Sequence, residues 1–471
     1  MDNLEQSVRQ LVQEVISNMG INIANDNQAR KIGVFTSIDA AINAAEFAFN
    51  ELNKLSLDTR KNIIENIRKV CLENNSTMSK MAYQETGLGR FEDKVAKNEF
   101  GIKKTPGVED IVPESYSDDH GLTLVEHAPY GVIGSITPTT NSTITIISNA
   151  IGMIAAGNSV VFNPHPSAKG VSCFLVDLIN RATIEVGGPV NLVTCIEEPT
   201  IDSAKELMSH KKIAILVVTG GPAVVKTAMN SGKKVIAAGP GNPPVVVDET
   251  ANIAKAAKDI VDGASFDNNI ICICEKEIIC VASVADRLKE EMKKNGVYEL
   301  SGELIERITN LVISEPGGPG IEGSANKKYV GKNAEYIAKE IGITVPSSTR
   351  LLLCEVDREH PLVWTEQLMP VMPIVRVKDV DAAIDLAVQC EHGFRHTAIM
   401  HSLNISKLSK MARVMNCSIF IKNGPSYAGL GFGGAGFASF TIASPTGEGV
   451  TRARTFTRER RCTLVDFFRI I

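Results

Sequence analysis

The sequence predicts an α/β fold in which parallel strands are joined by helices. From residue 32 onward, short runs of apolar and often β-branched residues alternate with longer helical segments. In chain order these runs are GVIGSIT, SVVFNP, VNLVTC, IAILVVTG, KKVIAAG and PPVVVD. The 471 residues also suffice for about two or three domains at ~150 residues each. Such alternation is typical of nucleotide-binding domains, in which crossover helices connect parallel strands.

Helical patterns flank these strands on both sides. Residues 37–55 and 59–75 form two predicted helices ahead of the first strand set. A second set consists of the strands EIICVAS, RLLLCEV and PIVRVK with predicted helices at 284–295 and 380–390. We therefore expect a domain boundary near residue 262.

The most apolar stretch, ITIISNAIGMIAAGNSVVF, is predicted to be a buried helix and strand rather than a membrane span. Polar residues and glycines interrupt it, which a lipid-facing helix disfavours. The interrupting residues are Ser148, Asn149, Gly152, Gly157 and Asn158.

Composition and charge exclude several classes of protein. The chain is 44% hydrophobic and 22% charged, as expected for a folded globular protein. Lys and Arg number 49 against 54 Asp and Glu, giving a net charge of −5 that disfavours binding of nucleic-acid phosphates. The 10 cysteines contain no repeated CxxC pair, and the N-terminus lacks the basic start of an export signal. These features favour a cytoplasmic protein with no membrane or nucleic-acid partner.

The two ends of the chain differ in pattern from its body. Residues 1–19 carry apolar side chains at steps of three and four, which predicts an amphipathic helix, and the Asn-rich residues 20–31 resemble a linker. The helix either folds back onto its own domain or docks on another protein. The last segment is glycine-rich, then basic, then apolar, which suits a tail that crosses to a neighbouring subunit.

The segment GASFDNNIICICEKE contains the most informative candidate residues. Cys272 and Cys274 lie near the expected domain junction, where clefts form. A cysteine there can be a nucleophile, a metal ligand or a small core residue. Two cysteines one residue apart with no nearby histidine make a poor zinc site, so we expect no metal. Two GxGxxG strings, 318–323 and 431–436, do not stand between a strand and a helix and are predicted to be loops.

A series of segments together resembles one known family. They are APYGVIGSITPTTNS, IGMIAAGNSVVFNPHPSAK, LVVTGGPAVV, KKVIAAGPGNPPVVVDETA, GASFDNNIICICEKE, TEQLMPVMPIVRV, FIKNGPSYAGLGFGG and SPTGEGVTRARTF. Nearly the whole chain resembles the CoA-acylating branch of the aldehyde dehydrogenase superfamily. The greatest similarity is to the propionaldehyde dehydrogenases of propanediol-utilization microcompartments, followed by the acetaldehyde dehydrogenases of ethanolamine utilization.

The resemblance implies an aldehyde dehydrogenase fold: a Rossmann-like cofactor domain, an α/β catalytic domain and a small oligomerisation element. We expect the NAD-binding domain at 32–262 and the catalytic thiol domain at 263–440. The oligomerisation element comprises a hairpin at about 115–128 and the tail 441–471. Such an element implies a homo-oligomer, either a dimer or a tetramer.

The resemblance also implies roles for two catalytic residues. Cys272 matches the nucleophile, whose thiolate attacks the aldehyde carbonyl and later carries the acyl group as a thioester. Asn141 matches the residue that donates a hydrogen bond to the oxyanion, together with the Cys272 backbone amide. From its neighbours alone, Asn141 is better explained as a turn residue, because PTTNS is rich in turn-forming residues. Relatives have proline after this asparagine, whereas this chain has Ser142.

Cofactor residues follow by position in the same motifs. Glu366 matches the glutamate that accepts hydrogen bonds from the nicotinamide ribose, although alone it also reads as a solvated loop acid. Small residues at a strand-to-helix junction let backbone amides approach a phosphate or nicotinamide. The expected cofactor-binding residues are Glu366, Pro164, His165, Thr219, Gly220 and Gly221. Asn163 stands where relatives have lysine, which leaves the choice between NAD and NADP open.

The chain lacks a glutamate that the resemblance would lead one to expect in hydrolytic enzymes of the family. Hydrolytic relatives carry a glutamate as general base where this chain has Ala237. Without that base water is a poor acyl acceptor, whereas coenzyme A provides a strong thiol nucleophile. The expected reaction therefore oxidises a short-chain aldehyde, propionaldehyde first, with NAD and CoA to acyl-CoA. An aldehyde-to-acid dehydrogenase and a catalytically silent scaffold are the rival hypotheses.

The N-terminal helix gains a function from the same resemblance. In microcompartment relatives a short tethered amphipathic helix packs against shell or cargo proteins. Residues 1–19 are therefore expected to direct the enzyme into a bacterial microcompartment in the cytoplasm.

Overall fold

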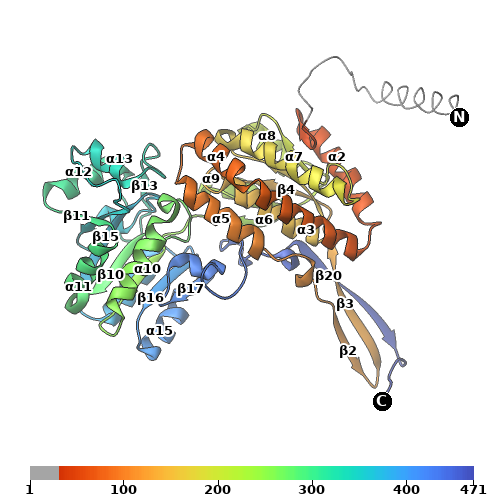
Figure 1. The fold of residues 1–471 in the computed structure, drawn as a ribbon. Helices are drawn as coiled ribbons and strands as arrows, with labels where there is room; N and C mark the ends of the chain where they lie inside the picture. The colour runs from red at the N-terminus through yellow and green to blue at the C-terminus, as the bar shows by residue number, and fades with distance from the viewer. Residues whose placement is uncertain (1–30) are drawn as a thin grey trace, which may run out of the picture. The chain divides into compact units, whose positions relative to one another are not determined.

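The structure, a computed structural model, describes residues 31–471 (Figure 1). Residues 32–471 form one compact unit. The expected targeting helix at 1–19 and residues 20–30 of the expected linker lie outside the described residues.

The first large sheet has six parallel strands in the order β1-β6-β5-β4-β7-β8. Its strands are β1 (Val34–Phe35), β4 (Val132–Ile136), β5 (Ser159–Asn163), β6 (Val193–Ile196), β7 (Ile213–Thr219) and β8 (Lys234–Ala238). The chain runs outward from β4 through β5 and β6, then returns to the other side of β4 with β7. The strand order therefore reverses between β4 and β7, where doubly wound sheets bind their ligands.

Helices cover both faces of this sheet. They are α2 (Ile38–Leu52), α3 (Leu57–Glu73), α4 (Asn75–Thr86), α5 (Phe91–Lys104), α6 (Ser142–Ala155), α7 (Lys169–Glu185), α8 (Ile201–Ser209) and α9 (Pro222–Met229). Ile215 and Val217 of β7 belong to the apolar cluster that contains α6 and α7, whereas Leu216 and Val218 belong to the cluster with α2 and α8. Strand side chains alternate between faces, so a strand buried on both faces is apolar throughout. Every residue of α6 is buried, which confirms the predicted core helix.

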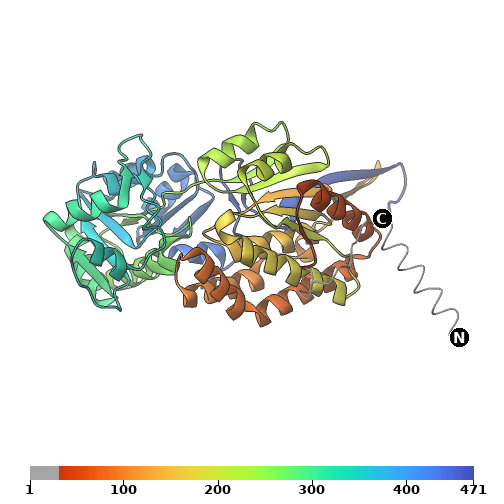
Figure 2. The ribbon, with the colours of Figure 1, turned by 90° about the horizontal axis from the view of Figure 1, so that it is seen from above.

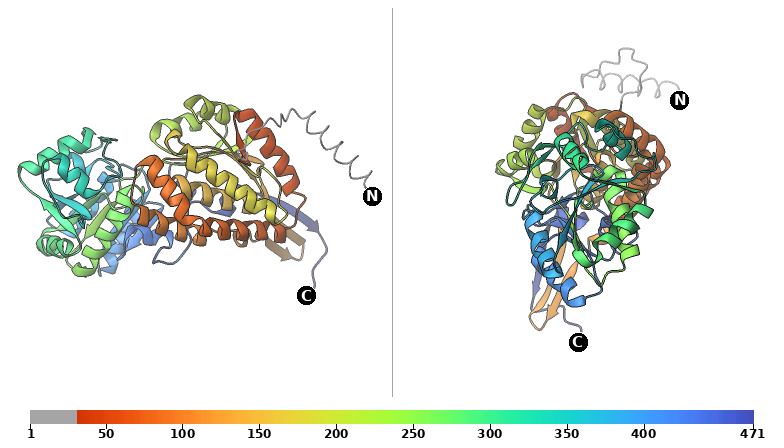
Figure 3. Two further views of the ribbon diagram at one scale, coloured as in Figure 1. Left: turned by 45° about the horizontal axis from the view of Figure 1, so that its top comes forward. Right: turned by 90° about the vertical axis from the view of Figure 1, so that its left-hand side faces the viewer.

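The second large sheet has seven parallel strands in the order β11-β14-β15-β10-β9-β16-β17. Its strands are β9 (Pro244–Val247), β10 (Glu277–Val281), β11 (Val297–Leu300), β14 (Leu351–Glu355), β15 (Val371–Val377), β16 (Thr397–His401) and β17 (Ile419–Lys422). Its helices are α10 (Ile253–Ser265), α11 (Ala282–Lys294), α12 (Glu303–Val312), α13 (Ala334–Glu340), α14 (Val380–Cys390) and α15 (Ile405–Met415). The two large sheets lie side by side (Figures 2 and 3).

The change of sheet occurs earlier in the chain than expected. The PPVVVD run forms β9, which pairs with β10 and β16 of the second sheet. The change therefore falls between Ala238 and Pro244, and residue 262 lies inside α10. An apolar run buried on both faces has the same pattern in either sheet, so its sequence does not show which partners it takes.

A third, antiparallel sheet consists of β2 (Glu114–Asp118), β3 (Gly121–Pro129) and β20 (Thr457–Val465). The expected hairpin at about 115–128 is present as β2 and β3. The tail strand β20 pairs with β3 from Thr457 opposite Pro129 to Val465 opposite Gly121. This sheet extends away from the two large sheets in Figure 1.

The remaining strands form two short antiparallel pairs. They are β12 (Ile313–Glu315) with β13 (Ser324–Ala325), and β18 (Ile442–Ala443) with β19 (Gly449–Val450). Both GxGxxG strings lie outside the helices and strands, as predicted. In the part of the chain that the structure describes, no helix has the length and apolar character needed to cross a membrane.

Candidate active site

Cys272 lies in the loop that joins α10 to β10. Three consecutive residues of this loop, Asp267, Asn268 and Asn269, have left-handed backbone angles with φ of 48°, 54° and 66°. The Asn268 amide donates to the carbonyl of Gly331 at 2.9 Å, and the Asn269 amide donates to the carbonyl of Ala264 at 2.7 Å. Asparagine and aspartate adopt this conformation more readily than most residues. The two asparagines before the cysteines therefore shape the loop through backbone contacts.

The two cysteines of the loop have different surroundings. Cys274 is 1% exposed and belongs to the apolar core, whereas Cys272 is only partly buried. Burial and, to a smaller extent, the negative charge of Glu366 raise the pKa of the Cys272 thiol to about 12, although the positive charge of Lys276 opposes them. Of the pair, Cys272 is the one placed to meet a substrate.

Lys276 is a buried cation that holds the nucleophile loop. Its Nζ donates to the backbone carbonyl of Asn269 at 3.1 Å and to that of Ile271 at 3.4 Å. The Asn269 side-chain oxygen accepts a third hydrogen bond at 2.5 Å. These bonds fix the backbone on both sides of Ile270 and leave a positive charge near Cys272.

Asn141 immediately precedes α6, after the loop that follows β4. Its Oδ1 accepts a hydrogen bond from the Nζ of Lys97 at 2.8 Å. Because the oxygen is held by a cation, the amide NH2 is directed away from Lys97 and can donate elsewhere. Ser142 occupies the first helical position, where the backbone N–H has no intrahelical partner, so serine and proline both suit it.

Gly241 brings four distant segments together. Its N–H donates to Glu366 Oε1 at 3.3 Å. A side chain at Gly241 would place its Cβ 3.0 Å from the Cys272 carbonyl oxygen and 2.9 Å from Cγ of His396. Glu366, Cys272 and His396 therefore surround this glycine, which lies in the short link between β8 and β9.

Glu366 is a partly buried acid with an altered pKa. Burial raises the pKa of its carboxyl group to about 7, although Lys276 and the Gly241 N–H oppose the shift. Its charge in turn raises the pKa of Cys272. The solvated-loop reading is therefore wrong, because this carboxylate lies next to the nucleophile loop.

Replacing Glu366 by glutamine should make Cys272 more reactive. Loss of the neighbouring negative charge lowers the thiol pKa, so we expect roughly two- to tenfold faster alkylation by iodoacetamide at pH 8. The difference should shrink below pH 7, because the wild-type carboxyl group is then itself protonated. Mass spectrometry of the Cys272 peptide measures the rate, with the exposed Glu359→Gln as the matched control. Equal rates in Glu366→Gln and wild type at pH 8 would contradict this coupling.

The other expected cofactor residues lie at the carboxyl edge of the first sheet. Pro164 and His165 directly follow β5, and Thr219 ends β7. Gly220 and Gly221 link β7 to the N-terminus of α9, and no atom lies within 4 Å of a Cβ built on Gly221. This open space at a helix N-terminus beside the strand reversal suits the phosphates of a dinucleotide.

Asn163 replaces a lysine and is turned into the protein. It is 4% exposed, and its Oδ1 accepts a hydrogen bond from Ser203 Oγ at 2.6 Å. This position therefore supplies no cation at the carboxyl end of β5.

Ala237, which is expected to stand at the position of the base in hydrolytic relatives, lies on β8. It is fully buried in the apolar cluster that includes Val218 and Val161, and its N–H donates to Thr446 Oγ1 at 3.0 Å. The position therefore offers no group to activate water.

Several residues of the site were missed by the sequence analysis. Lys94, Lys97 and Asn98 are buried on α5, and Asp267 and His396 are buried in loops. One signal was present: the buried face of α5 carries polar residues at steps of three and four where an apolar stripe is expected. Burial lowers the pKa of His396 to about 3, so its imidazole is neutral beside Gly241.

Comparison with known proteins identifies this arrangement. The Aldehyde dehydrogenase family matches residues 28–310 of the chain. The chain belongs to this family. An acetaldehyde dehydrogenase (acetylating) of Bilophila wadsworthia is 49% identical over 488 residues, covering 100% of both chains. A propanal dehydrogenase (CoA-propanoylating) of Citrobacter freundii is 48% identical over 439 residues, covering 93% of this chain and 94% of the relative.

Solved structures of other aldehyde dehydrogenases share the fold. A propionaldehyde dehydrogenase of Rhodopseudomonas palustris, with bound CoA and an acylated cysteine, is 52% identical, with a TM-score of 0.89. The match covers 92% of this chain and 98% of that one. A propionaldehyde dehydrogenase from a fucose utilisation microcompartment of Clostridium phytofermentans is 48% identical, with a TM-score of 0.90, covering 93% and 100%. The expected aldehyde dehydrogenase fold is therefore confirmed.

Proposed function

We propose that this aldehyde dehydrogenase converts a short-chain aldehyde, NAD and CoA to acyl-CoA and NADH. The observation that carries the proposal is the partly buried Cys272 in a site whose hydrolytic position holds the buried, apolar Ala237. Relatives that span nearly the whole chain carry names with the same chemistry, acetylating and CoA-propanoylating. A scaffold without activity would not need a cysteine and an acid that meet at Gly241 from distant segments.

The first half of the reaction is assigned to Cys272 and Asn141. The Cys272 thiolate attacks the aldehyde carbon, and the negative charge that develops on oxygen is met by the Asn141 amide and the Cys272 backbone N–H. NAD, when bound, supplies the acceptor for the hydride. Glu366 and the amides at 220 and 221 would hold that cofactor, and the loss of hydride from the adduct leaves a thioester on Cys272.

The second half of the reaction transfers the acyl group to CoA. The CoA thiolate attacks the thioester carbon, the C–S bond to Cys272 breaks, and the Cys272 thiolate leaves. Water competes poorly, because no carboxylate at residue 237 is available to remove its proton. This half exchanges one thioester for another, so the acyl transfer should run in either direction.

Dependence on CoA tests this proposal directly. With propanal and NAD, we expect NADH formation to fall at least ~10-fold when CoA is omitted, because the thioester accumulates and blocks turnover. The measurement is NADH absorbance, with acyl-CoA identified by mass spectrometry. Equal turnover without CoA, with propanoate as product, would mean that water reaches the thioester and that Ala237 does not prevent hydrolysis.

Propanal is the proposed substrate and acetaldehyde the alternative. One methylene in an apolar pocket changes kcat/KM by roughly 10- to 200-fold. Comparing kcat/KM for the two aldehydes distinguishes the readings, and a higher value for acetaldehyde would favour the acetylating one.

Self-association is proposed through the third sheet. Val465, Phe467, Phe468, Ile470 and Ile471 are exposed apolar residues at the end of β20 and beyond it. A patch of this kind favours burial against another subunit, here in a dimer or tetramer. Sedimentation of a chain truncated after residue 456 tests this: a truncated chain that keeps the size of the full-length oligomer would contradict it.

Encapsulation is proposed for residues 1–19, which lie outside the described residues. Support comes from their amphipathic pattern and from the microcompartment source of a solved relative. A fluorescent protein fused to residues 1–19 should enter microcompartments, and diffuse fluorescence would contradict the proposal.

A further inference from the structure

Helix α5 buries two lysine side chains beside the candidate active site. Lys94 is 3% exposed and Lys97 is 1% exposed, while Asp267 in the nucleophile loop is fully buried. Removing a charged group from water is costly unless it is paired, so such residues are rare in protein interiors. Neither lysine has a place in the mechanism described above.

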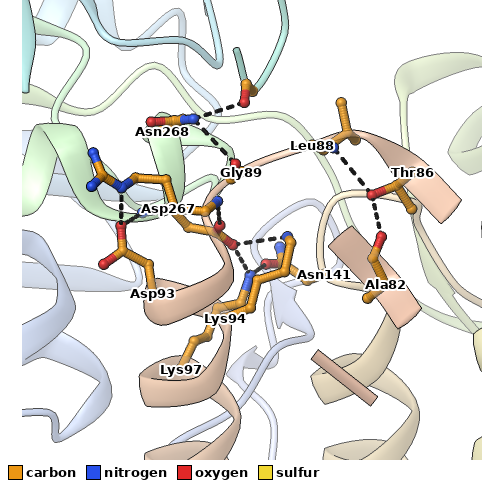
Figure 4. A network of polar contacts seen from close by, with 12 residues as sticks. Ala82, Thr86, Leu88, Gly89, Asp93, Lys94, Lys97, Asn141, Asp267 and Asn268 are labelled. Atoms are coloured by element: carbon orange, nitrogen blue, oxygen red, sulfur yellow. Dashed lines mark hydrogen bonds and ion pairs between the residues drawn. The ribbon is translucent and has the colours of Figure 1, made fainter. Parts of the chain in front are cut away.

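The two lysines meet one carboxylate. Lys97 Nζ forms an ion pair with Asp267 Oδ2, and Lys94 Nζ lies 3.2 Å from the same oxygen (Figure 4). The other oxygen, Asp267 Oδ1, accepts from the Arg90 backbone N–H at 2.8 Å. Although burial opposes ionisation of Asp267, the two lysines hold its pKa below the ordinary value. The carboxylate therefore remains charged and anchors both ammonium groups.

Gly89 leaves the space that this ion cluster needs. A Cβ at Gly89 would lie 1.9 Å from Asp267 Oδ1 and 2.9 Å from Lys94 Nζ. Gly89 also has a left-handed φ of 74°. Both the backbone and the space at residue 89 therefore require glycine next to the cluster.

Lys97 joins the cluster to Asn141. Its Nζ lies 2.8 Å from Asn141 Oδ1 while it contacts Asp267. Asn141 precedes α6, and Asp267 belongs to the loop that carries Cys272. The Lys97 ammonium group therefore connects the two segments that carry the two proposed oxyanion donors, the Asn141 amide and the Cys272 N–H. The amide of an asparagine can rotate by half a turn, which would present its oxygen to the oxyanion. The bond from Lys97 prevents that rotation.

The cluster also carries an excess of positive charge. Lys94 and Lys97 share Asp267, and burial lowers the pKa of Lys94 only to about 8, so it is mostly protonated at neutral pH. A fixed positive charge close to a developing oxyanion is effective because little water screens it.

We propose that Lys97 is a positioning residue for acyl transfer. Lys97 is anchored by Asp267 and orients the Asn141 amide toward the oxyanion. It also fixes the position of that amide relative to the Cys272 loop. This inference rests on the proposed function, in which Asn141 and the Cys272 N–H bind the oxyanion.

A double-mutant cycle tests the inference. Lys97→Met should lower kcat by roughly 10- to 100-fold with the KM for NAD changed less than about twofold. Because Lys97 acts through Asn141, Lys97→Met should cause less than about twofold further loss in an Asn141→Ala background. Multiplicative losses in the double variant, or a normal kcat in Lys97→Met, would overturn the inference.

Two controls separate positioning from general damage. Lys103→Met changes an exposed lysine on the same helix that pairs with Glu99, and it should leave kcat unchanged. Alkylation of Cys272 by iodoacetamide needs no oxyanion site, so its rate in Lys97→Met should stay within about twofold of wild type. A parallel loss of alkylation and kcat would indicate a collapsed loop and would contradict a positioning role.

A second variant covers the case in which Lys97→Met does not fold. Lys97→Gln keeps a donor for Asp267 and Asn141 but removes the charge, so its kcat should lie between those of Lys97→Met and wild type. If neither variant folds with NAD bound, Lys97 is a structural residue and the inference is wrong. Failure of the proposed function would look different, because wild-type protein would then form NADH without needing CoA.

Discussion

Cys272→Ala should abolish NADH formation from propanal, with a loss of at least ~10³-fold in kcat. The Cys272 sulfur is the atom that bonds to the aldehyde carbon, and without that bond no tetrahedral adduct forms from which the hydrogen can leave as hydride. The Cys272 side chain is partly buried at the edge of the core, so its truncation removes little packing. We therefore expect an unchanged Tm and unchanged NAD binding by calorimetry.

Cys274→Ala is the matched control for this result. Cys274 lies two residues after Cys272 on the same loop. Its side chain is in the core, and its Sγ lies 3.9 Å from the carbonyl oxygen of Phe266. Loss of its sulfur should lower the free energy of unfolding by about 1 kcal/mol and leave kcat within about twofold of wild type. An active Cys272→Ala together with an inactive Cys274→Ala would reverse the assignment of the nucleophile.

Asn141→Ala should lower kcat by roughly 10²- to 10³-fold while the KM for aldehyde changes little. The amide hydrogen bond strengthens as charge develops on oxygen, so its loss raises the energy of the transition state more than that of the bound substrate. Steady-state kinetics with propanal, NAD and CoA provide the measurement. A change confined to KM would mean that Asn141 only binds substrate.

Ser142→Pro provides the control for the Asn141 loop. It restores the residue found in relatives at a helical position that needs no backbone N–H, so kcat should stay within about twofold of wild type. A loss comparable to that of Asn141→Ala would show that loop conformation, rather than the amide donor, limits the rate.

Local pattern was sufficient to predict many of the strands and several of the helices of the fold. Runs such as IAILVVTG and SVVFNP became β7 and β5, and helix 380–390 was found at Val380–Cys390. These elements are buried on one or both faces, and their side-chain periodicity reflects that burial directly. The assignment of PPVVVD to the first sheet was wrong, because the pairing of a strand depends on partners that are distant in the sequence. The residues of the strand itself do not show which partners it takes.

In the candidate site, too, some residues were predicted from the sequence, whereas their contacts are seen only in the structure. Cys272, Asn141 and Glu366 were identified from motifs that resemble a family, and the structure adds that Glu366 and Cys272 both approach Gly241. The sequence by itself predicted element types from local spacing, and its resemblance to a family supplied the candidate nucleophile and the missing base at Ala237. Only the tertiary structure decided which polar groups share an interior. Lys97, Asn141 and Asp267 come from three separate segments, and their charges are tolerated because folding brings them within hydrogen-bonding distance.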